Sequence, residues 1–443
     1  MEDLPDIKVP VPGPRGQEII EKDKRYIATT TKTSPVAVQR ASGAMVWGVD
    51  GNRYLDFTSG IGVTNTGHCH PRVVEAVQRQ AAELMHFAGT DFYYSIQADL
   101  AKRLTEVAPG EGDKKVFYTN SGAESVEAAI KLSRWSSQRK RFMAFLGAFH
   151  GRTMGALSLT ASKIVQRERF VPTMPGVSHV PFAYCYRCPY KMEYPSCDLW
   201  CAKIIEEVYF QQLVPPSEVA ALFMESVQGE GGYVVPPSDW VREIKAITQR
   251  HGILLVDDEV QAGFGRTGRW FGIEHHGVEA DIYCMAKGMG SGMPIGCIVF
   301  REDLDWRVKG AHSNTYGGNL VASAAALATI DVLESEDLVG NSARMGAHLH
   351  KRLLELQEKH DEIGDVRGLG LMQATEFVKD RRTKERAIEL RDRLTVEAYK
   401  RGLILLPCGR NAMRYIPPLV IKEHQVDAAV EIIDESLKAA KAG

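Results

Sequence analysis

The sequence predicts an α/β fold: a large domain with a mostly parallel central sheet, joined to a smaller α+β domain. Through the middle of the 443-residue chain, short apolar runs alternate with helical patterns, as in a parallel sheet covered on both faces. After Tyr316 long amphipathic helices dominate. A hairpin near the N-terminus is too small to fold alone. We therefore expect residues 1–70 to form an N-terminal segment and part of the small domain, 71–325 the large domain, and 326–443 the rest of the small domain.

The expected elements follow in chain order. A short helix at 17–26 precedes a hairpin at 44–57, whose turn is Asp50-Gly51-Asn52, and a helix at 71–84. The large domain has strands at 115–119, 142–146, 219–225, 253–257, 282–285 and 298–300, with helices at 123–134 and 239–249. The C-terminal part has helices at 320–333, 343–357, 384–401 and 425–441, with strands at 371–377 and 413–416.

Composition and charge exclude several classes of function. The formal net charge is -2, and no basic run interleaved with aromatic residues predicts a nucleic-acid surface. The acidic, Pro-rich first sixteen residues lack the apolar core of a secretory signal, and no apolar run approaches membrane-spanning length. These features predict a soluble cytoplasmic protein that acts on small molecules.

Two residues at strand ends carry the strongest chemical signal. Lys287 follows an apolar run in ADIYCMAKGMGSGMPIG, and desolvation there would lower the pKa of its amine and make it a nucleophile. Asp258 ends the run ILLVDDEVQ, at the sheet edge where ligands bind in α/β proteins. Such a carboxylate can protonate a pyridine nitrogen. Taken singly, Lys287 is more simply interpreted as a surface lysine, and Asp258 as an acid that caps a loop.

Other segments could hold the remaining parts of a cofactor and substrate. Small residues in Asn120-Ser-Gly-Ala-Glu124 open a helix, where backbone N–H groups bind phosphate, although Ser121 as an ordinary N-cap is an alternative. Phe149 can stack on a flat ring, and Arg152 and Arg414 can each bind a carboxylate. The GFGRTG segment at 263–268 matches a dinucleotide motif, but no apolar helix follows it.

At these residues the chain resembles class III (ω-amino acid) aminotransferases of pyridoxal-phosphate fold type I, and in motif it is most similar to 4-aminobutyrate aminotransferases. The resemblance runs from Val36 onward. Its motifs are DGNRYLDFTSGIGVTNTGHCHP, NSGAESVEAAIK, FHGRTMGA, ESVQGEGG, LLVDDEVQAGFGRTG, AKGMGSGMPIG and NTYGGN.

The resemblance implies a role for each matching residue. Pyridoxal phosphate would form a Schiff base with Lys287, which then moves the α-proton, while Asp258 pairs with the ring nitrogen. The implied cofactor contacts are Gln261 at the ring hydroxyl, Val260 and Phe149 on the two ring faces, Gly122 and Ala123 beside Ser121 at the phosphate, and Thr315 from a partner subunit of a homodimer. The implied substrate contacts are Ile61, Arg152 at the distal carboxylate, Arg414 at the α-carboxylate, and Glu230, which neutralises Arg414 when an ω-amino substrate is bound.

The substrate is less well defined by sequence. Ile61 stands where ornithine aminotransferases usually have Tyr, which favours a 4-aminobutyrate-like donor. Similar sequences include amino-acid racemases, which remain an alternative, as does an ornithine aminotransferase. Because a racemase takes no dicarboxylate acceptor, Arg152 together with Arg414 favours ping-pong transfer to 2-oxoglutarate. Ser226 in ESVQGEGG replaces the usual Pro, without an evident mechanistic consequence.

Four cysteines form a cluster that departs from bacterial members of the family. They are spaced as Cys185-x2-Cys188-x8-Cys197-x3-Cys201. Four thiolates at this spacing could hold Zn²⁺ or an iron–sulfur cluster. Two disulfides, or four free thiols, are the alternatives.

Overall fold

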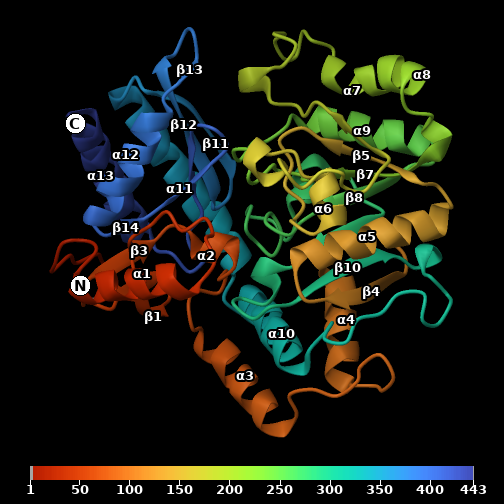
Figure 1. Cartoon of the computed structure of the whole chain (residues 1–443), viewed down its shortest axis with the longest axis horizontal. Helices are drawn as coiled ribbons and strands as arrows, with labels where there is room; N and C mark the ends of the chain where they lie inside the picture. The colour runs from red at the N-terminus through yellow and green to blue at the C-terminus, as the bar shows by residue number, and fades with distance from the viewer. Residues whose placement is uncertain (1–2, 443) are drawn as a thin grey trace.

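The computed structural model describes residues 3–442 and contains three β-sheets (Figure 1). A seven-stranded sheet with its helices makes up the larger part of the molecule, and the smaller part combines N-terminal and C-terminal segments. Both termini lie in this smaller part (Figure 1).

The seven-stranded sheet has the strand order β4-β10-β9-β8-β7-β5-β6. Its strands are β4 (Lys114–Thr119), β5 (Arg141–Phe145), β6 (Val177–Val180), β7 (Val219–Met224), β8 (Leu254–Asp258), β9 (Ile282–Met285) and β10 (Gly296–Arg301). The pairs β9-β8, β8-β7, β7-β5 and β5-β6 are parallel. The predicted α/β fold with a mostly parallel central sheet is confirmed.

Strand β10 runs antiparallel to both of its neighbours, β9 and β4. Only residues 286–295 connect β9 to β10. A parallel crossover needs a dozen or more residues, so this short connection reverses the chain. Because β4 is antiparallel to β10, it runs in the same direction as the parallel strands.

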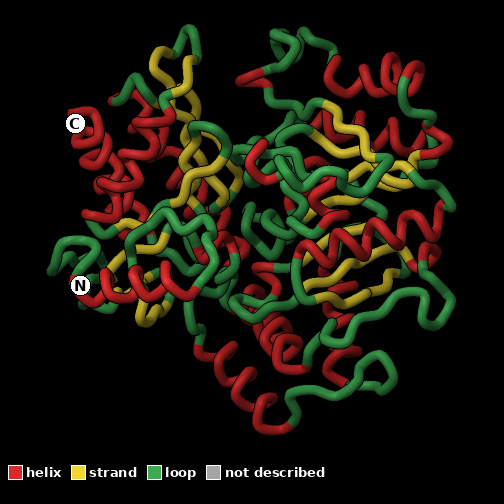
Figure 2. Tube along the Cα trace, viewed as in Figure 1, coloured by secondary structure: helices red, strands yellow, loops and turns green. Residues whose placement is uncertain are grey.

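Alternate side chains of each central strand enter different hydrophobic cores. On β7, Leu222 and Met224 join one core, with helices α4 (Ser95–Val107), α9 (Ser238–Arg250) and α10 (Leu320–Ser335). Ala221 and Phe223 join the other, with α5 (Gly122–Ser137) and α6 (Met154–Leu159). Helices therefore cover both faces of the sheet, as Figure 2 shows, and the strands are apolar throughout.

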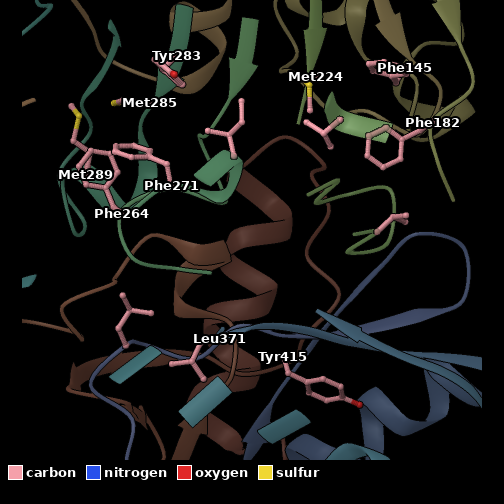
Figure 3. Close-up of a cluster of buried hydrophobic side chains, with 14 of the residues drawn as sticks. Phe145, Phe182, Met224, Phe264, Phe271, Tyr283, Met285, Met289, Leu371 and Tyr415 are labelled. Carbon is pink, nitrogen blue, oxygen red and sulfur yellow. The ribbon is translucent and has the colours of Figure 1, made fainter. Parts of the chain in front are cut away.

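The first of these cores continues into the smaller part of the molecule. Leu371 and Tyr415 belong to the same buried cluster as Phe145, Met224 and Met285 (Figure 3). The two parts thus share packed surface.

The smaller part contains a four-stranded sheet, β1-β2-β3-β14, and a five-stranded antiparallel one built on β11-β12-β16-β15 with β13 beside β12. Strand β3 of the N-terminal hairpin pairs parallel with β14, so the hairpin is completed by C-terminal residues. These strands are β1 (Val38–Ser42), β2 (Met45–Gly48), β3 (Arg53–Asp56), β11 (Ile363–Leu369), β12 (Met372–Asp380), β13 (Glu385–Arg386), β14 (Leu403–Ile404), β15 (Leu406–Cys408) and β16 (Ala412–Tyr415).

The remaining helices are α1 (Pro14–Tyr26), α2 (Ser59–Gly62), α3 (Pro71–Glu83), α7 (Trp200–Ile204), α8 (Phe210–Gln212), α11 (Leu338–Lys359), α12 (Ile388–Lys400) and α13 (Glu423–Ala442). One expected helix, 384–401, was predicted too long, because its first residues form β13 and pair with β12. Among residues 3–442, no helix is long and apolar enough to cross a membrane.

Candidate active site

Asp258 is placed by the alternation of side chains along β8. Val256 belongs to the core on the α5 side, so Asp258, two residues later, faces the same side at the carboxyl end of the strand. Asp257 points the other way. Burial and the neighbouring Glu259 raise the pKa of Asp257 well above its ordinary value. Of the two adjacent acids, only Asp258 faces the helix that begins at Gly122.

The carboxylate of Asp258 is held by a buried histidine. His150 Nδ1 lies 2.8 Å from Asp258 Oδ2, and the backbone N–H of Val260 donates to Asp258 Oδ1 at 3.1 Å. Burial lowers the pKa of His150, but the hydrogen bond and charge of Asp258 outweigh it, and the net pKa is raised. His150 and the Val260 N–H therefore fix the position of both carboxylate oxygens of Asp258.

A second buried acid, Glu225, lies near this pair. It accepts hydrogen bonds from the N–H groups of Phe149 (3.1 Å) and Gly229 (3.0 Å). Burial raises the pKa of Glu225 to about 7, with the charge of Asp258 contributing and that of His150 opposing.

Lys287 begins the short 3₁₀ helix η6 (Lys287–Met289), two residues after β9 ends. Its φ of 44° is in the left-handed region, which a non-glycine residue occupies at a cost in strain. Desolvation, followed by repulsion from Arg414, lowers the pKa of Lys287 to about 8, although Asp258, Glu225 and Glu230 oppose the shift. About one tenth of Lys287 is therefore the neutral, nucleophilic amine at pH 7, and about half at pH 8.

The start of α5 is a close-packed backbone turn. Ser121 is the N-cap, and its Oγ accepts from the N–H of Glu124 at 3.3 Å. A Cβ on Gly122 would lie 2.8 Å from Val260 Cγ1, and a Cβ on Gly151 would lie 2.8 Å from that of Ala123. The helix N-terminus is thus brought directly against the loop that follows Asp258, with room for backbone but not for larger side chains.

Gln261 lies next to Gly229. Its Oε1 is buried and has no hydrogen-bond partner among residues 3–442, and a Cβ on Gly229 would lie 2.8 Å from it. Gln261 Cγ would be 3.6 Å from a Cβ on Gly62, whose neighbour Ile61 is exposed and has a φ of 72°. A β-branched residue in this conformation is strained.

Glu230 is shared between two cations. Arg414 Nη1 lies 3.5 Å from Glu230 Oε2, and the ammonium of Lys163 forms a short ion pair with Oε1. Arg414 comes from β16 and is buried, whereas Lys163 comes from the loop after α6. Glu230 can therefore keep one cationic partner when Arg414 turns to another carboxylate.

Two further predicted residues, Arg152 and Thr315, lie on the surface. Arg152 is exposed, and its Cζ sits 5.7 Å from the ring centroid of Phe149. Thr315 is also exposed, beside the exposed Tyr316. The structure brings Phe149 close to Asp258 through His150 and Glu225, but in the single chain it places Thr315 on the surface.

Sequence reasoning missed His150, Glu225 and Lys163. His150 and Glu225 stand within quoted motifs, FHGRTMGA and ESVQGEGG, so the signal for them was present. No pattern in the sequence marks Lys163, because its ion pair with Glu230 spans 67 residues.

A reactive lysine and a histidine-held acid at the carboxyl edge of a mostly parallel sheet define a pyridoxal-phosphate enzyme of fold type I. The chain belongs to the class-III aminotransferase family, whose model matches residues 26–437.

Relatives within the family differ in named activity. The chain is 38% identical to the leucine/methionine racemase of Thermococcus litoralis, over 97% of both chains. It is 40% identical to the acetylornithine aminotransferase of Archaeoglobus fulgidus, over 94% of this chain and 99% of the relative. It is 37% identical to a probable 4-aminobutyrate aminotransferase of Bacillus subtilis, over 90% and 92%. A solved amine transaminase from an uncultivated Pseudomonas species, in its PLP-bound form, superposes with a TM-score of 0.86 at 31% identity and covers 94% of this chain and 98% of that one.

The residues present fit pyridoxal phosphate, the cofactor expected for this family. Lys287 has the lowered pKa that an imine-forming amine needs. Asp258 is held for a ring nitrogen, the orphaned Oε1 of Gln261 is available to a hydroxyl, and the N-terminus of α5, capped by Ser121, offers backbone N–H groups to a phosphate.

The four-cysteine cluster does not fit a metal in this geometry. The thiols of Cys185, Cys188, Cys197 and Cys201 are free and lie in one segment, where burial first, and then the other three thiols, raise the pKa of Cys201 to about 12. Within residues 3–442, no three of these sulfur atoms come within 4.8 Å of one another. A tetrahedral Zn²⁺ site or an iron–sulfur cluster requires closer thiolates.

Proposed function

We propose that this protein transfers the amino group of an ω-amino acid resembling 4-aminobutyrate to 2-oxoglutarate, with donor and acceptor using one site in turn. The observation that carries the proposal is Glu230, placed between Arg414 and Lys163 beside the Lys287 amine. Because Glu230 can pair with Arg414 or with Lys163, one site can accept substrates that have one carboxylate or two.

Pyridoxal phosphate, when bound, supplies an aldehyde that condenses with amines and a ring that withdraws electrons. We assign the phosphate to the N–H groups at Gly122 and Ala123, capped by Ser121. Asp258, held by His150, keeps a proton on the ring nitrogen. We place the ring between Val260 and Phe149, with its hydroxyl toward Gln261.

Lys287 acts as the base that takes and returns the substrate proton. Its pKa of about 8 lies close to neutral pH, where a general base is most effective. Glu225, with a pKa of about 7, lies close enough to adjust the charge of this group as protons move.

The contacts to carboxylates determine which substrates the site binds. An ω-amino donor has one carboxylate, remote from the reacting carbon, which we assign to Arg152; Arg414 then stays paired with Glu230. 2-Oxoglutarate has a second carboxylate next to the reacting carbon. We assign it to Arg414, while Glu230 keeps its contact with Lys163. We also assign Ile61, which precedes Gly62 in the chain, to the substrate side, where it offers no hydroxyl to select ornithine.

We further propose that the active unit is a homodimer in which Thr315 reaches the partner's phosphate. Thr315 is exposed, and exposed apolar side chains gather in the surrounding segments: Met85, Phe87, Phe92, Tyr93 and Tyr316. The ring of Tyr316 lies 5.0 Å from that of His86, so the two segments are adjacent. Apolar patches of this kind mark contact surfaces between chains. Sedimentation of an active monomer would rule this arrangement out.

An amino-acid racemase is the second candidate, favoured by the similarity to the Thermococcus litoralis racemase. Incubation with single L-amino acids, with and without 2-oxoglutarate, followed by chiral chromatography, separates the two. We expect glutamate to form from 4-aminobutyrate only when 2-oxoglutarate is present. Inversion of a neutral α-amino acid without any keto acid would replace the proposal with the racemase.

A further inference from the structure

A cavity of about 240 Å³ lies between the large and small parts of the molecule, apart from the residues assigned above. Its walls come from the loop after β5, from the segment that opens the cysteine cluster, from the loop after β7, and from β11, β12 and β13. None of the residues assigned to cofactor or substrate lines it.

Charge in this cavity is unbalanced. Four guanidinium groups line it, against the single carboxylate of Glu376. The guanidinium groups belong to Arg187, Arg367, Arg386 and Arg410. Taking cations out of water without partners is costly, so an excess of guanidinium groups at a cavity favours an anionic occupant.

Two of the four arginines are held by protein acceptors. Arg367 Nη1 lies 2.6 Å from Asp365 and 2.8 Å from Glu376, and its other two nitrogens donate to Gly232 O at 3.0 and 2.7 Å. Arg187 Nε binds the other oxygen of Glu376. The only lining carboxylate is therefore already shared, and it also accepts from the hydroxyl of Tyr184.

The remaining donors have no acceptor. Within the described residues 3–442, Arg187 Nη2 and Arg386 Nε are buried without a hydrogen-bond partner, and neither Arg386 nor Arg410 forms an ion pair. Burial, with the nearby charges of Arg187 and Arg410, lowers the pKa of Arg386. Arg187 and Arg386 thus present buried donors without an acceptor to the cavity, and Arg410, which is exposed, adds a third guanidinium group to its lining.

We propose that this cavity binds a small oxyanion with at least two negative charges, either inorganic phosphate or a short dicarboxylate. Forked guanidinium donors match both carboxylate and phosphate oxygens. The cavity is smaller than the pockets that take drug-sized ligands, which restricts the occupant to a few heavy atoms.

The wall of the cavity is continuous with the loop that carries Glu230. Gly231 and Gly232 line the cavity, and the N–H of Gly409, another lining residue, donates to Glu230 O at 2.8 Å. An anion bound between Arg187 and Arg386 would stabilise the loop that carries Glu230. Binding would thereby tie the small part of the molecule to the loop beside the active site.

Calorimetric titration of the holoenzyme with phosphate and, separately, with succinate tests the proposal at constant ionic strength. We expect at least one anion to bind, and Arg386→Met or Arg410→Met to weaken it about tenfold to 100-fold. Arg382→Met is the matched control, because Arg382 is exposed on the same hairpin and has no ion pair within residues 3–442. Neither test arginine has a protein carboxylate partner, so both variants should fold, and far-UV circular dichroism would check this.

The outcomes separate the possible sources. Phosphate binding alone assigns a phosphate site, and succinate binding alone assigns a dicarboxylate site. Succinate binding that is unchanged in both test variants would place the ligand in the active site, and no binding of either anion would leave the cavity without the proposed role. Either of these last two results overturns the proposal.

Discussion

The residues proposed to hold the cofactor and those proposed to bind the substrate have different surroundings. On the cofactor side, Asp258 is buried against His150, and Gly122 packs tightly on Val260. On the substrate side, Arg152 and Ile61 are exposed, and Glu230 divides its charge between two cations. The proposed cofactor contacts are thus fixed by packing, whereas the proposed substrate contacts can change partners, and relatives of the chain are named both as a racemase and as aminotransferases.

Removing the lysine should have the largest effect. Lys287→Ala takes away both the nucleophilic amine and the proton-transfer group, and proton transfer alone contributes about 10²–10⁴-fold. We expect turnover to be lost and, after reduction with borohydride and denaturation, no cofactor to remain covalently attached. Lys309→Ala, at an exposed lysine, is the control. A fully active Lys287→Ala variant would refute the assignment of this residue.

The two adjacent acids of β8 should respond in opposite ways. Asp258→Asn removes a buried negative charge and should lower kcat by about 10²-fold or more while the cofactor stays bound. Asp257 faces away from α5, and burial raises its pKa, so Asp257→Asn should leave kcat within a few fold. Equal losses in steady-state kcat for the two variants would show that the acid at 258 has only a structural role.

On the substrate side, Arg152→Ala should weaken 4-aminobutyrate and 2-oxoglutarate together. Loss of one bidentate carboxylate contact predicts a fall in kcat/KM of about tenfold to a few hundredfold for both. Arg382→Ala, at an exposed arginine far along the chain, provides the comparison. A decrease for only one of the two substrates would mean that they do not share this contact.

The lysine also has a pH-dependent cost to stability in the cofactor-free protein. Its folded pKa, about 8, lies below the ordinary 10.5, so the stability contributed by neutral Lys287 is present above pH 10.5 and is lost as the pH falls through about 8. We expect Lys287→Met to raise the free energy of unfolding by about 3 kcal/mol at pH 7, and by roughly 2 kcal/mol less at pH 9.5. Urea denaturation at both pH values measures this. A gain that does not depend on pH would show that the lysine is not desolvated.

Sequence could predict the cofactor side well because its residues stand at strand ends that apolar runs define. Asp258 ends β8, Lys287 follows β9, and Ser121 caps α5, the role predicted as the alternative to phosphate binding. The same alternation of side chains also separates Asp258 from Asp257, although periodicity alone does not show which face meets α5.

The substrate side could not be predicted to the same depth, because its contacts join distant segments. Lys163 meets Glu230 across 67 residues and Arg414 meets it across 184. The direction of β10 depends on a ten-residue connection rather than on its apolar pattern. The possible metal site at the four cysteines gains no support from the described residues, because cysteine spacing does not fix how closely the sulfur atoms approach.

The measurement that tests the central claim most directly is donor preference in Glu230→Ala. Without Glu230, Arg414 has no carboxylate partner when an ω-amino donor binds, so an α-carboxylate should be favoured in its place. We predict that the ratio of kcat/KM for 4-aminobutyrate to that for L-glutamate falls by about tenfold or more relative to the wild-type protein. A ratio that stays unchanged, with 4-aminobutyrate still used at the wild-type rate, would contradict the account.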